Sequence, residues 1–206
     1  MEILLLRHAE TDWNLKRRCQ GVSDLDLNES GVRQAREIGE SLRHEPIRVI
    51  VSSDLKRARQ TAAAVRRHHP GVPLVIDRNF RELDHGDLEG LTFDEVRERY
   101  PEFMAQWRVA PARLRTPGGE SLAAVAARAW AALEGVARRW PEGTAVVVTH
   151  NFPILSILCR VTGTDLNDYR SFRIAPCALA RIGYEAGQGW RLLEPCASGA
   201  PDKSLP

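Results

Sequence analysis

The sequence predicts a three-layer α/β/α sandwich built on a mostly parallel central sheet. Short apolar segments alternate along the chain with segments of helical periodicity, and the apolar segments suit strands that are buried on both faces. No internal repeat or long linker divides the 206 residues. We therefore expect one domain over residues 1–197, which is long enough for a sizeable core, and a polar, frayed tail over 198–206.

Four short apolar runs are predicted to form the parallel strands. Each run is bounded by polar or charged residues, as expected of buried strands. The runs span residues 3–6, 49–53, 74–76 and 145–149. Two weaker segments, 178–184 and 190–193, are expected to close the sheet as a hairpin.

Segments with apolar residues at helical spacing are predicted to form the outer layers. They span residues 31–43, 55–67, 92–107 and 121–140, and a further helix follows Pro153. Asp54 is expected to cap the second helix, and Thr92 with Glu95 forms the capping-box pattern of the third. The irregular segment 100–120 is rich in proline and glycine and suits a lid beside a site.

The composition excludes several classes of function. Hydrophobic residues make up 43% and charged residues 27% of the chain, as in ordinary globular proteins. The net charge of +2 is too small to favour nucleic acid or an acidic membrane as a partner. No segment approaches the roughly 18 apolar residues of a membrane span, and the first residues lack a signal-peptide pattern. We therefore expect a cytoplasmic protein.

The cysteines are scattered and form no CxxC pair, which predicts free thiols and not a zinc site. They are Cys19, Cys159, Cys177 and Cys196.

Three predicted strands end in residues that suit phosphate chemistry. His8 follows the first strand, Arg57 lies soon after the second, and His150 follows the last. Parallel strands bring their carboxyl ends to one edge of the sheet, where open α/β sheets bind ligands. Arg7 and Arg57 offer planar sets of donors that match phosphate oxygens, and the nearby helix N-terminus also favours an anion.

Two histidines and a glutamate suggest a division of labour at this edge. One histidine would attack phosphorus as a neutral ring, and the other would donate to the oxygens whose charge grows in the transition state. Glu82 is the best candidate to protonate the leaving oxygen, because a carboxyl group beside a phosphate dianion has a raised proton affinity. Each residue alone has an ordinary structural explanation, such as a surface histidine or a salt bridge, so the prediction depends on the combination.

The order and spacing of several motifs resemble those of the histidine phosphatase superfamily, the phosphoglycerate-mutase-like proteins. The first motifs are Arg7-His8-Ala9-Glu10-Thr11 with Asn14, then Gln20-Gly21. The later ones are Ser52-Ser53-Asp54-Leu55 with Arg57, Glu82 with Gly86, Gly118-Gly119-Glu120-Ser121, and Val148-Thr149-His150. Each piece alone is weak, but their joint order over residues 2–195 is specific.

The resemblance implies a catalytic role for five residues. His8 would be the phosphorylated nucleophile, and Arg7, Arg57 and His150 would complete the phosphate pocket. Glu82 would protonate the leaving alcohol and then help to activate water. The resemblance implies no metal and no other cofactor, and the sequence lacks a P-loop, an HExxH motif and a tight carboxylate cluster.

The resemblance also implies residues that bind substrate. Asn14 would lend a donor to the phosphoryl group, Gln20 and Gly21 would line the pocket on a loop, and Asn151 would lie beside its floor. Ala9 and Asn151 depart from the family, in which many members have glycine at each place. Neither departure removes a catalytic group.

A short segment between Gly86 and Gly118 favours hydrolysis over isomerisation. Phosphoglycerate mutases have longer chains, with paired arginines and a tyrosine in an extra segment, and no such arginine pair lies here. A more open pocket would let water reach the phosphohistidine. A phosphatase is therefore predicted, with a phosphoglycerate mutase as the alternative of another class.

Among the phosphatases, the chain most resembles the metal-independent phosphoserine phosphatases. The matching pieces are Glu82-Leu83-Asp84-His85-Gly86, Tyr100-Pro101-Glu102, Gly118-Gly119-Glu120-Ser121-Leu122 and Thr162-Gly163. In that group the residue at His85 is implicated in substrate contact, although His85 could instead cap the turn before Gly86. That group also carries a histidine after a cysteine near the C-terminus, whereas Ala197 follows Cys196 here.

The predicted substrate is therefore a small phosphorylated metabolite, with phosphoserine as one candidate. α-Ribazole phosphatases and broad-range phosphatases of the superfamily have similar lengths and remain alternatives, as does a protein phosphatase with less support. A non-catalytic phosphate-binding module would have lost at least one of His8, Arg57, Glu82 and His150, and all are present. An exposed apolar sheet edge would support a homodimer.

Overall fold

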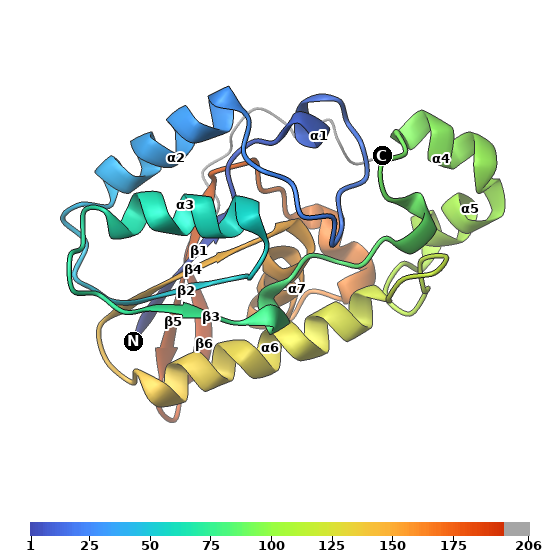
Figure 1. The fold of residues 1–206 in the computed structure, drawn as a ribbon. Coiled ribbons are helices and arrows are strands. Elements are labelled where there is room, and N and C mark those ends of the chain that lie inside the picture. Colours follow the sequence, from blue (N-terminus) through green and yellow to red (C-terminus); the bar gives the residue numbers. More distant parts are fainter. Residues whose placement is uncertain (196–206) are drawn as a thin grey trace.

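The computed structural model describes residues 1–195 and shows a six-stranded sheet between helical layers (Figure 1). The strand order is β3-β2-β4-β1-β5-β6. The parallel strands are β1 (Glu2–Arg7), β2 (Ile47–Ser52), β3 (Leu74–Ile76) and β4 (Thr144–Thr149). β5 (Leu179–Glu185) and β6 (Gly189–Glu194) form the predicted antiparallel hairpin beside β1. The predicted α/β sandwich with a mostly parallel sheet is confirmed.

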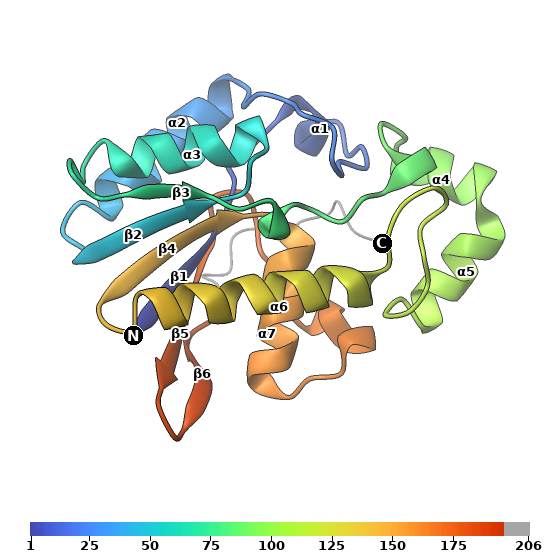
Figure 2. The ribbon, with the colours of Figure 1, turned by 60° about the horizontal axis from the view of Figure 1, so that its bottom comes forward.

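Different helices cover the two faces of the sheet (Figure 2). One face carries α2 (Glu29–Ser41) and α3 (Lys56–Arg66), and the other carries α6 (Leu122–Arg139) and α7 (Asn151–Thr162). Because successive side chains of a strand point to opposite faces, Leu4 and Leu6 belong to the first core, whereas Ile3 and Leu5 belong to the second. Burial on both faces explains why the strands are unbroken apolar runs in the sequence.

The predicted helix over 92–107 is in fact two helices, α4 (Phe93–Arg99) and α5 (Pro101–Val109). The capping box of Thr92 and Glu95 is confirmed at the start of α4. Pro101 interrupts the helix because proline lacks an N–H and disfavours helical geometry in the residue before it. Tyr100 accordingly has φ −129° and ψ 54°. The pair α4–α5 lies beyond one end of the sheet, apart from the two helical layers (Figure 1).

The predicted capping of α3 by Asp54 is wrong. Leu55 occupies the N-cap position and provides no capping hydrogen bond from its side chain. Asp54 instead accepts two hydrogen bonds of 2.6 Å from Arg81. The Lys56 N–H donates to Asp24 Oδ1 at 2.7 Å, so a residue distant in sequence satisfies the first turn of this helix.

The remaining elements are short. They are α1 (Asp12–Leu15) and the 3-10 helices η1 (Arg78–Phe80), η2 (Gly86–Leu88) and η3 (Leu166–Ser171). No helix within residues 1–195 is long and apolar enough to cross a membrane. Cys19, Cys159 and Cys177 are free thiols, whereas Cys196 and the predicted tail 198–206 lie outside the described residues.

Candidate active site

The register of the parallel strands brings three strand ends to one place. Arg7 pairs with Thr149 across β1 and β4, and the His8 N–H donates to Thr149 O at 2.9 Å. The Ser53 N–H, just past β2, donates to Val148 O at 3.0 Å. The ring centroids of His8 and His150 consequently lie 5.1 Å apart.

A hollow of about 50 Å³ opens beside His8. The predicted site residues that line it are Arg7, His8, Asn14, Gln20, Glu82, His85 and Asn151. Arg57 and His150 have no exposed surface and are not among its lining residues. The sequence prediction missed Arg18, Cys19, Phe93 and Phe152, which also line the hollow. Two of these four, Cys19 and Phe152, lie directly beside predicted residues in the chain, but no pattern in the sequence identifies Phe93.

His8 is held in one tautomer. Its Nδ1 lies 2.7 Å from Ala9 O, and because a carbonyl oxygen only accepts, Nδ1 carries the proton and Nε2 keeps its lone pair. Burial, followed by the charges of Arg57 and Arg7, holds the pKa of His8 well below its usual value. The ring is therefore neutral near pH 7, with Nε2 available as a nucleophile.

Two buried arginines are anchored by backbone carbonyls around this ring. Arg57 donates from Nη2 to Gly21 O at 2.7 Å and from Nη1 to Ser23 O at 2.8 Å, and its Nε has no hydrogen-bond partner among the described residues. Burial lowers the pKa of Arg57 to about 10, so it stays charged at neutral pH. Arg7 Nη1 donates to Ile174 O at 2.5 Å. Because a guanidinium group carries five N–H donors, Arg57 keeps further donors for an anion.

His150 is oriented by Ser53. This role of Ser53 was not predicted from the sequence. His150 Nε2 lies 2.8 Å from Ser53 Oγ, and the buried Nδ1 of His150 has no hydrogen-bond partner within residues 1–195. Burial, followed by the charges of Arg57 and His8, holds the pKa of His150 well below its usual value. A buried polar atom without a partner is costly, so Nδ1 is suited to a bound anion.

Glu82 lies at the N-terminus of α7. Its Oε1 accepts from the N–H groups of Leu83 at 2.9 Å and Phe152 at 3.0 Å, and its Oε2 accepts from the Asn151 N–H at 2.9 Å. These bonds favour the carboxylate, but burial outweighs them and raises the pKa of Glu82. A raised pKa is what a general acid near neutral pH requires.

A loop of polar residues forms one wall of the hollow. Thr11 N–H donates to Asn14 Oδ1 at 3.1 Å, and Thr11 Oγ1 donates to Gln20 Oε1 at 2.8 Å. These bonds leave the buried Nε2 of Gln20 without a partner in the described part of the chain. Gly21 follows, and a Cβ there would lie only 2.7 Å from Leu83 O. The loop can approach the segment that carries Glu82 because this residue is glycine.

His85 faces the hollow, and although it occupies the N-cap position of η2, its side chain does not cap that turn. No hydrogen bond from its side chain caps η2, and its ring centroid lies 5.7 Å from that of Phe152 in an edge-on arrangement. Burial lowers the pKa of His85 to about 4, so the ring is neutral at physiological pH.

A second, apolar hollow of about 40 Å³ adjoins the first. Cys19, His85, Phe93 and Phe152 line both hollows. The far wall of the second one comes from α5 through Phe103, Met104 and Trp107 and from the following loop through Thr116. The segment 100–120 therefore lies beside the site, as expected, but it is not irregular throughout, because residues 101–109 form α5.

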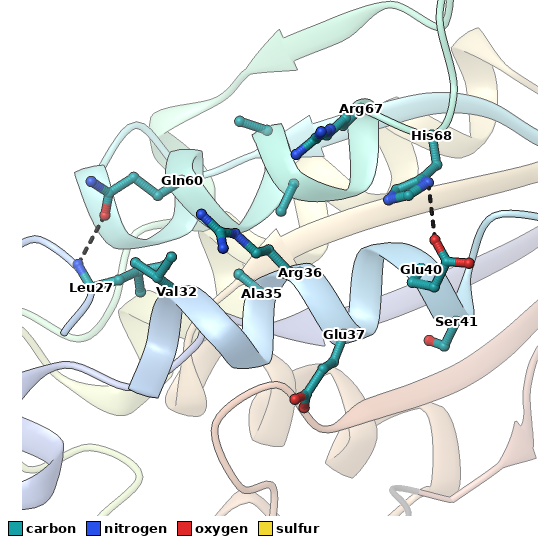
Figure 3. A pocket seen from close by; sticks show the side chains of 12 residues that line it. Leu27, Val32, Ala35, Arg36, Glu37, Glu40, Ser41, Gln60, Arg67 and His68 are labelled. Carbon is teal, nitrogen blue, oxygen red and sulfur yellow. Dashed lines mark hydrogen bonds and ion pairs between the residues drawn. The ribbon is translucent and has the colours of Figure 1, made fainter. Parts of the chain in front are cut away.

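A larger hollow of about 880 Å³ lies elsewhere, between α2 and α3 (Figure 3). None of the predicted site residues lines it. Its one histidine, His68, lies with Nδ1 3.4 Å from Glu40 Oε2, and Gln60 accepts from the Leu27 N–H (Figure 3). Arg36 and Arg67 line it, but its hydroxyl side chain, Ser41, is exposed and no nucleophilic side chain in its lining is buried, so we place the candidate active site at the carboxyl edge of the sheet.

Comparisons with known proteins agree with this geometry. The sequence model of the family described as histidine phosphatase superfamily (branch 1) matches residues 3–196. A relative from Hydrogenobacter thermophilus named "Phosphoserine phosphatase 1" is 38% identical over 172 residues, which cover 84% of this chain and 81% of the relative. A relative from Yersinia pestis named "Probable phosphoglycerate mutase GpmB" is 32% identical over 194 residues, which cover 92% and 90%.

Solved structures give the same result. A mycobacterial glucosyl-3-phosphoglycerate phosphatase in complex with VO3 superposes with a TM-score of 0.87 at 28% identity, covering 96% of this chain and 99% of that one. The family match spans nearly all the described residues and includes every strand end that forms the site. The chain belongs to the histidine phosphatase superfamily.

Proposed function

We propose that the protein hydrolyses a small-molecule phosphomonoester through a phosphohistidine intermediate on His8. The observation that carries the proposal is the state of the His8 ring. His8 Nδ1 donates to Ala9 O at 2.7 Å, and a low pKa keeps the ring neutral, so Nε2 offers a lone pair. The flanking guanidinium groups of Arg7 and Arg57 are suited to the phosphoryl oxygens, whose charge must be stabilised in the transition state.

In the first step, Nε2 of His8 attacks phosphorus and the bond between phosphorus and the leaving oxygen breaks. Glu82 gives its proton to that oxygen, so the product leaves as a neutral alcohol. In the second step, the Glu82 carboxylate takes a proton from water as the water attacks phosphorus. The P–N bond then breaks, which releases inorganic phosphate and restores neutral His8 and protonated Glu82.

Hydrolysis, and not phosphoryl transfer between two positions of one substrate, is the proposed outcome. The segment between Gly86 and Gly118 forms the end of η2, α4, α5 and loops, and it contains no two adjacent arginines. The relative named as a phosphoglycerate mutase supports the alternative. Interconversion of 2- and 3-phosphoglycerate, stimulated by the bisphosphate, would establish mutase activity, and its absence beside phosphate release would reject it.

Phosphoserine is the first substrate to test, because a relative at 38% identity is named for it. The apolar hollow beside the site favours instead a leaving group with apolar surface, as in the α-ribazole and broad-range alternatives. Among the four lining residues that the sequence did not predict, Arg18 is the one with a positive charge. Its Nη1 already donates to Gly90 O at 2.5 Å. A panel of phosphoserine, α-ribazole 5'-phosphate, phosphoglycerates and aryl phosphates separates these candidates by kcat/KM.

The decisive experiment measures phosphate release by the wild type, His8→Ala and a matched control, His44→Ala, which removes an exposed histidine. We expect loss of activity only in His8→Ala. Quenching the wild type at high pH during turnover should show an added phosphoryl group on the peptide that contains His8. Full activity of His8→Ala would refute the proposed mechanism.

A further inference from the structure

Glu82 belongs to a segment, residues 79–84, whose backbone is held largely by side chains. We propose that Arg128 is a positioning residue that sets the place of the Glu82 carboxyl group from the opposite side of the segment. This inference rests on the proposed role of Glu82 as the acid. Arg128 lies on α6, is not among the residues that line the hollow, and has no part in the steps described above.

The guanidinium group of Arg128 binds three carbonyls of the segment. Nη1 donates to Asn79 O at 2.8 Å and to Arg81 O at 2.6 Å, and Nη2 donates to Glu82 O at 2.9 Å. Phe80 lies between Asn79 and Arg81 in the chain, and its carbonyl accepts from the Thr149 hydroxyl at 2.6 Å. Four consecutive carbonyls are thus bound by two side chains, one from α6 and one from the end of β4.

Glu120 in turn orients Arg128. Its Oε1 lies 2.5 Å from Nη2 and its Oε2 lies 3.3 Å from Nε. The same Oε1 accepts from the Asp84 N–H at 3.1 Å, and the Glu120 N–H donates to Asp84 O at 3.0 Å. The Arg128–Glu120 pair therefore binds the segment at both of its ends, at Asn79 before Glu82 and at Asp84 after it.

This arrangement bears on catalysis because the carboxyl group is placed through its backbone. Phe80 and Leu83 on either side of Glu82 are buried, and the carboxylate is bound to the N–H groups at the start of α7. A shift of the backbone would move the acid away from the leaving oxygen, and misplacement by about 1 Å costs on the order of 100-fold in rate. Only the planar fork of arginine, with donors on three nitrogens, can bind three carbonyls and a carboxylate together.

The test compares Arg128→Gln with Arg138→Gln, a control on an exposed position of the same helix. Two probe substrates are used, glycerol 2-phosphate, whose alkoxide needs a proton to leave, and 4-nitrophenyl phosphate, which barely needs one. We expect Arg128→Gln to lower kcat/KM for glycerol 2-phosphate about 10- to 100-fold and for nitrophenyl phosphate far less. Arg128→Lys, which keeps the charge but not the fork, should recover only part of the loss, and Arg138→Gln should match the wild type.

A double variant separates positioning from a general effect on folding. If Arg128 acts through Glu82, adding Arg128→Gln to Glu82→Gln should cause no further loss on glycerol 2-phosphate. An added loss of full size, equal losses on both substrates, or wild-type activity in Arg128→Gln would overturn the inference. Should Arg128→Gln fail to fold, Glu120→Gln tests the same point, with a smaller loss of the same leaving-group dependence.

The same measurements distinguish a failure of the positioning role of Arg128 from a failure of the acid role of Glu82. Equal losses on the two substrates in Glu82→Gln alone would reject Glu82 as the acid. A selective loss in Glu82→Gln without one in Arg128→Gln would reject only the role of Arg128.

Discussion

Replacing Glu82 by glutamine tests both the structural and the chemical role of this residue. The carboxylate accepts three backbone N–H bonds, from Leu83, Asn151 and Phe152. A glutamine can accept with its oxygen only. If that oxygen takes the place of Oε1, the Asn151 N–H faces an NH₂ group and loses its acceptor. One buried donor without a partner costs about 1–3 kcal/mol, which is the expected loss in the free energy of unfolding below pH 4.5.

The stability difference should also depend on pH. Burial raises the pKa of Glu82 in the folded state above the value of 4.5 for an unperturbed glutamate. Its stabilising contribution is therefore complete below pH 4.5 and is lost as pH rises through the folded-state pKa. Glutamine has no such dependence, so the difference between the wild type and Glu82→Gln in urea unfolding should shrink from pH 4 towards pH 8. A difference that grows with pH would show that the pKa of Glu82 is lowered and not raised.

The effect on catalysis is expected to depend on the leaving group. General acid catalysis contributes about 10²- to 10⁴-fold, so kcat/KM for alkyl phosphates should fall by this factor in Glu82→Gln. For nitrophenyl phosphate the loss should be much smaller, because nitrophenolate leaves without a proton. The assay is initial-rate kinetics on both esters at the same pH. Equal losses would refute the assignment of Glu82 as the acid.

Three further changes test the rest of the site. Gly21→Ala places a Cβ 2.7 Å from Leu83 O and should displace the Gly21 carbonyl that anchors Arg57. The Kd for orthovanadate, measured by calorimetry, should therefore rise about tenfold, as for the loss of one charged hydrogen bond. An unchanged Kd would contradict this. Because the pKa of His8 is well below 6.5 and that of Glu82 is raised, kcat/KM should stay level as pH falls through 6.5 and decline on the alkaline side; a loss of activity centred at pH 6.5 would show an unperturbed histidine. Dialysis against EDTA should leave phosphate release unchanged, and a loss restored by a divalent metal would reject the predicted metal independence.

The strands and the strand-end residues were predictable because they carry local patterns. Residues 3–6 are unbroken apolar because both faces of β1 are covered. Most predicted strands and helices differ from the observed ones by at most two residues at their ends. The exceptions are the helix divided at Pro101 and the last helix, which was expected after Pro153 but begins at Asn151. Parallel pairing then requires His8 and His150 to meet, since β1 and β4 are neighbours. For these features the periodicity of the sequence contains the necessary information.

The contacts that orient the site were not predictable, because they join side chains to distant backbone atoms. Arg128 binds Asn79 O across 49 residues, and Asp24 caps α3 across 32. Any carbonyl can accept such a bond, so no residue type marks the partner. The choice of Ala9 O as the acceptor for His8 is local, but it depends on the φ and ψ angles of the chain and not on the identity of the side chain.

The proposed chemistry requires a neutral nucleophile and a protonated acid to coexist, and a single physical cause favours both. Removal of water disfavours every charged form, so burial lowers the pKa of His8 and raises the pKa of Glu82. Arg7 and Arg57 reinforce the first shift and oppose the second, because positive charge disfavours imidazolium and favours carboxylate. An incoming phosphate dianion would compensate these cations, and the proton affinity of Glu82 would then rise when the substrate is bound. The acid is thus most fully protonated in the complex in which its proton is needed.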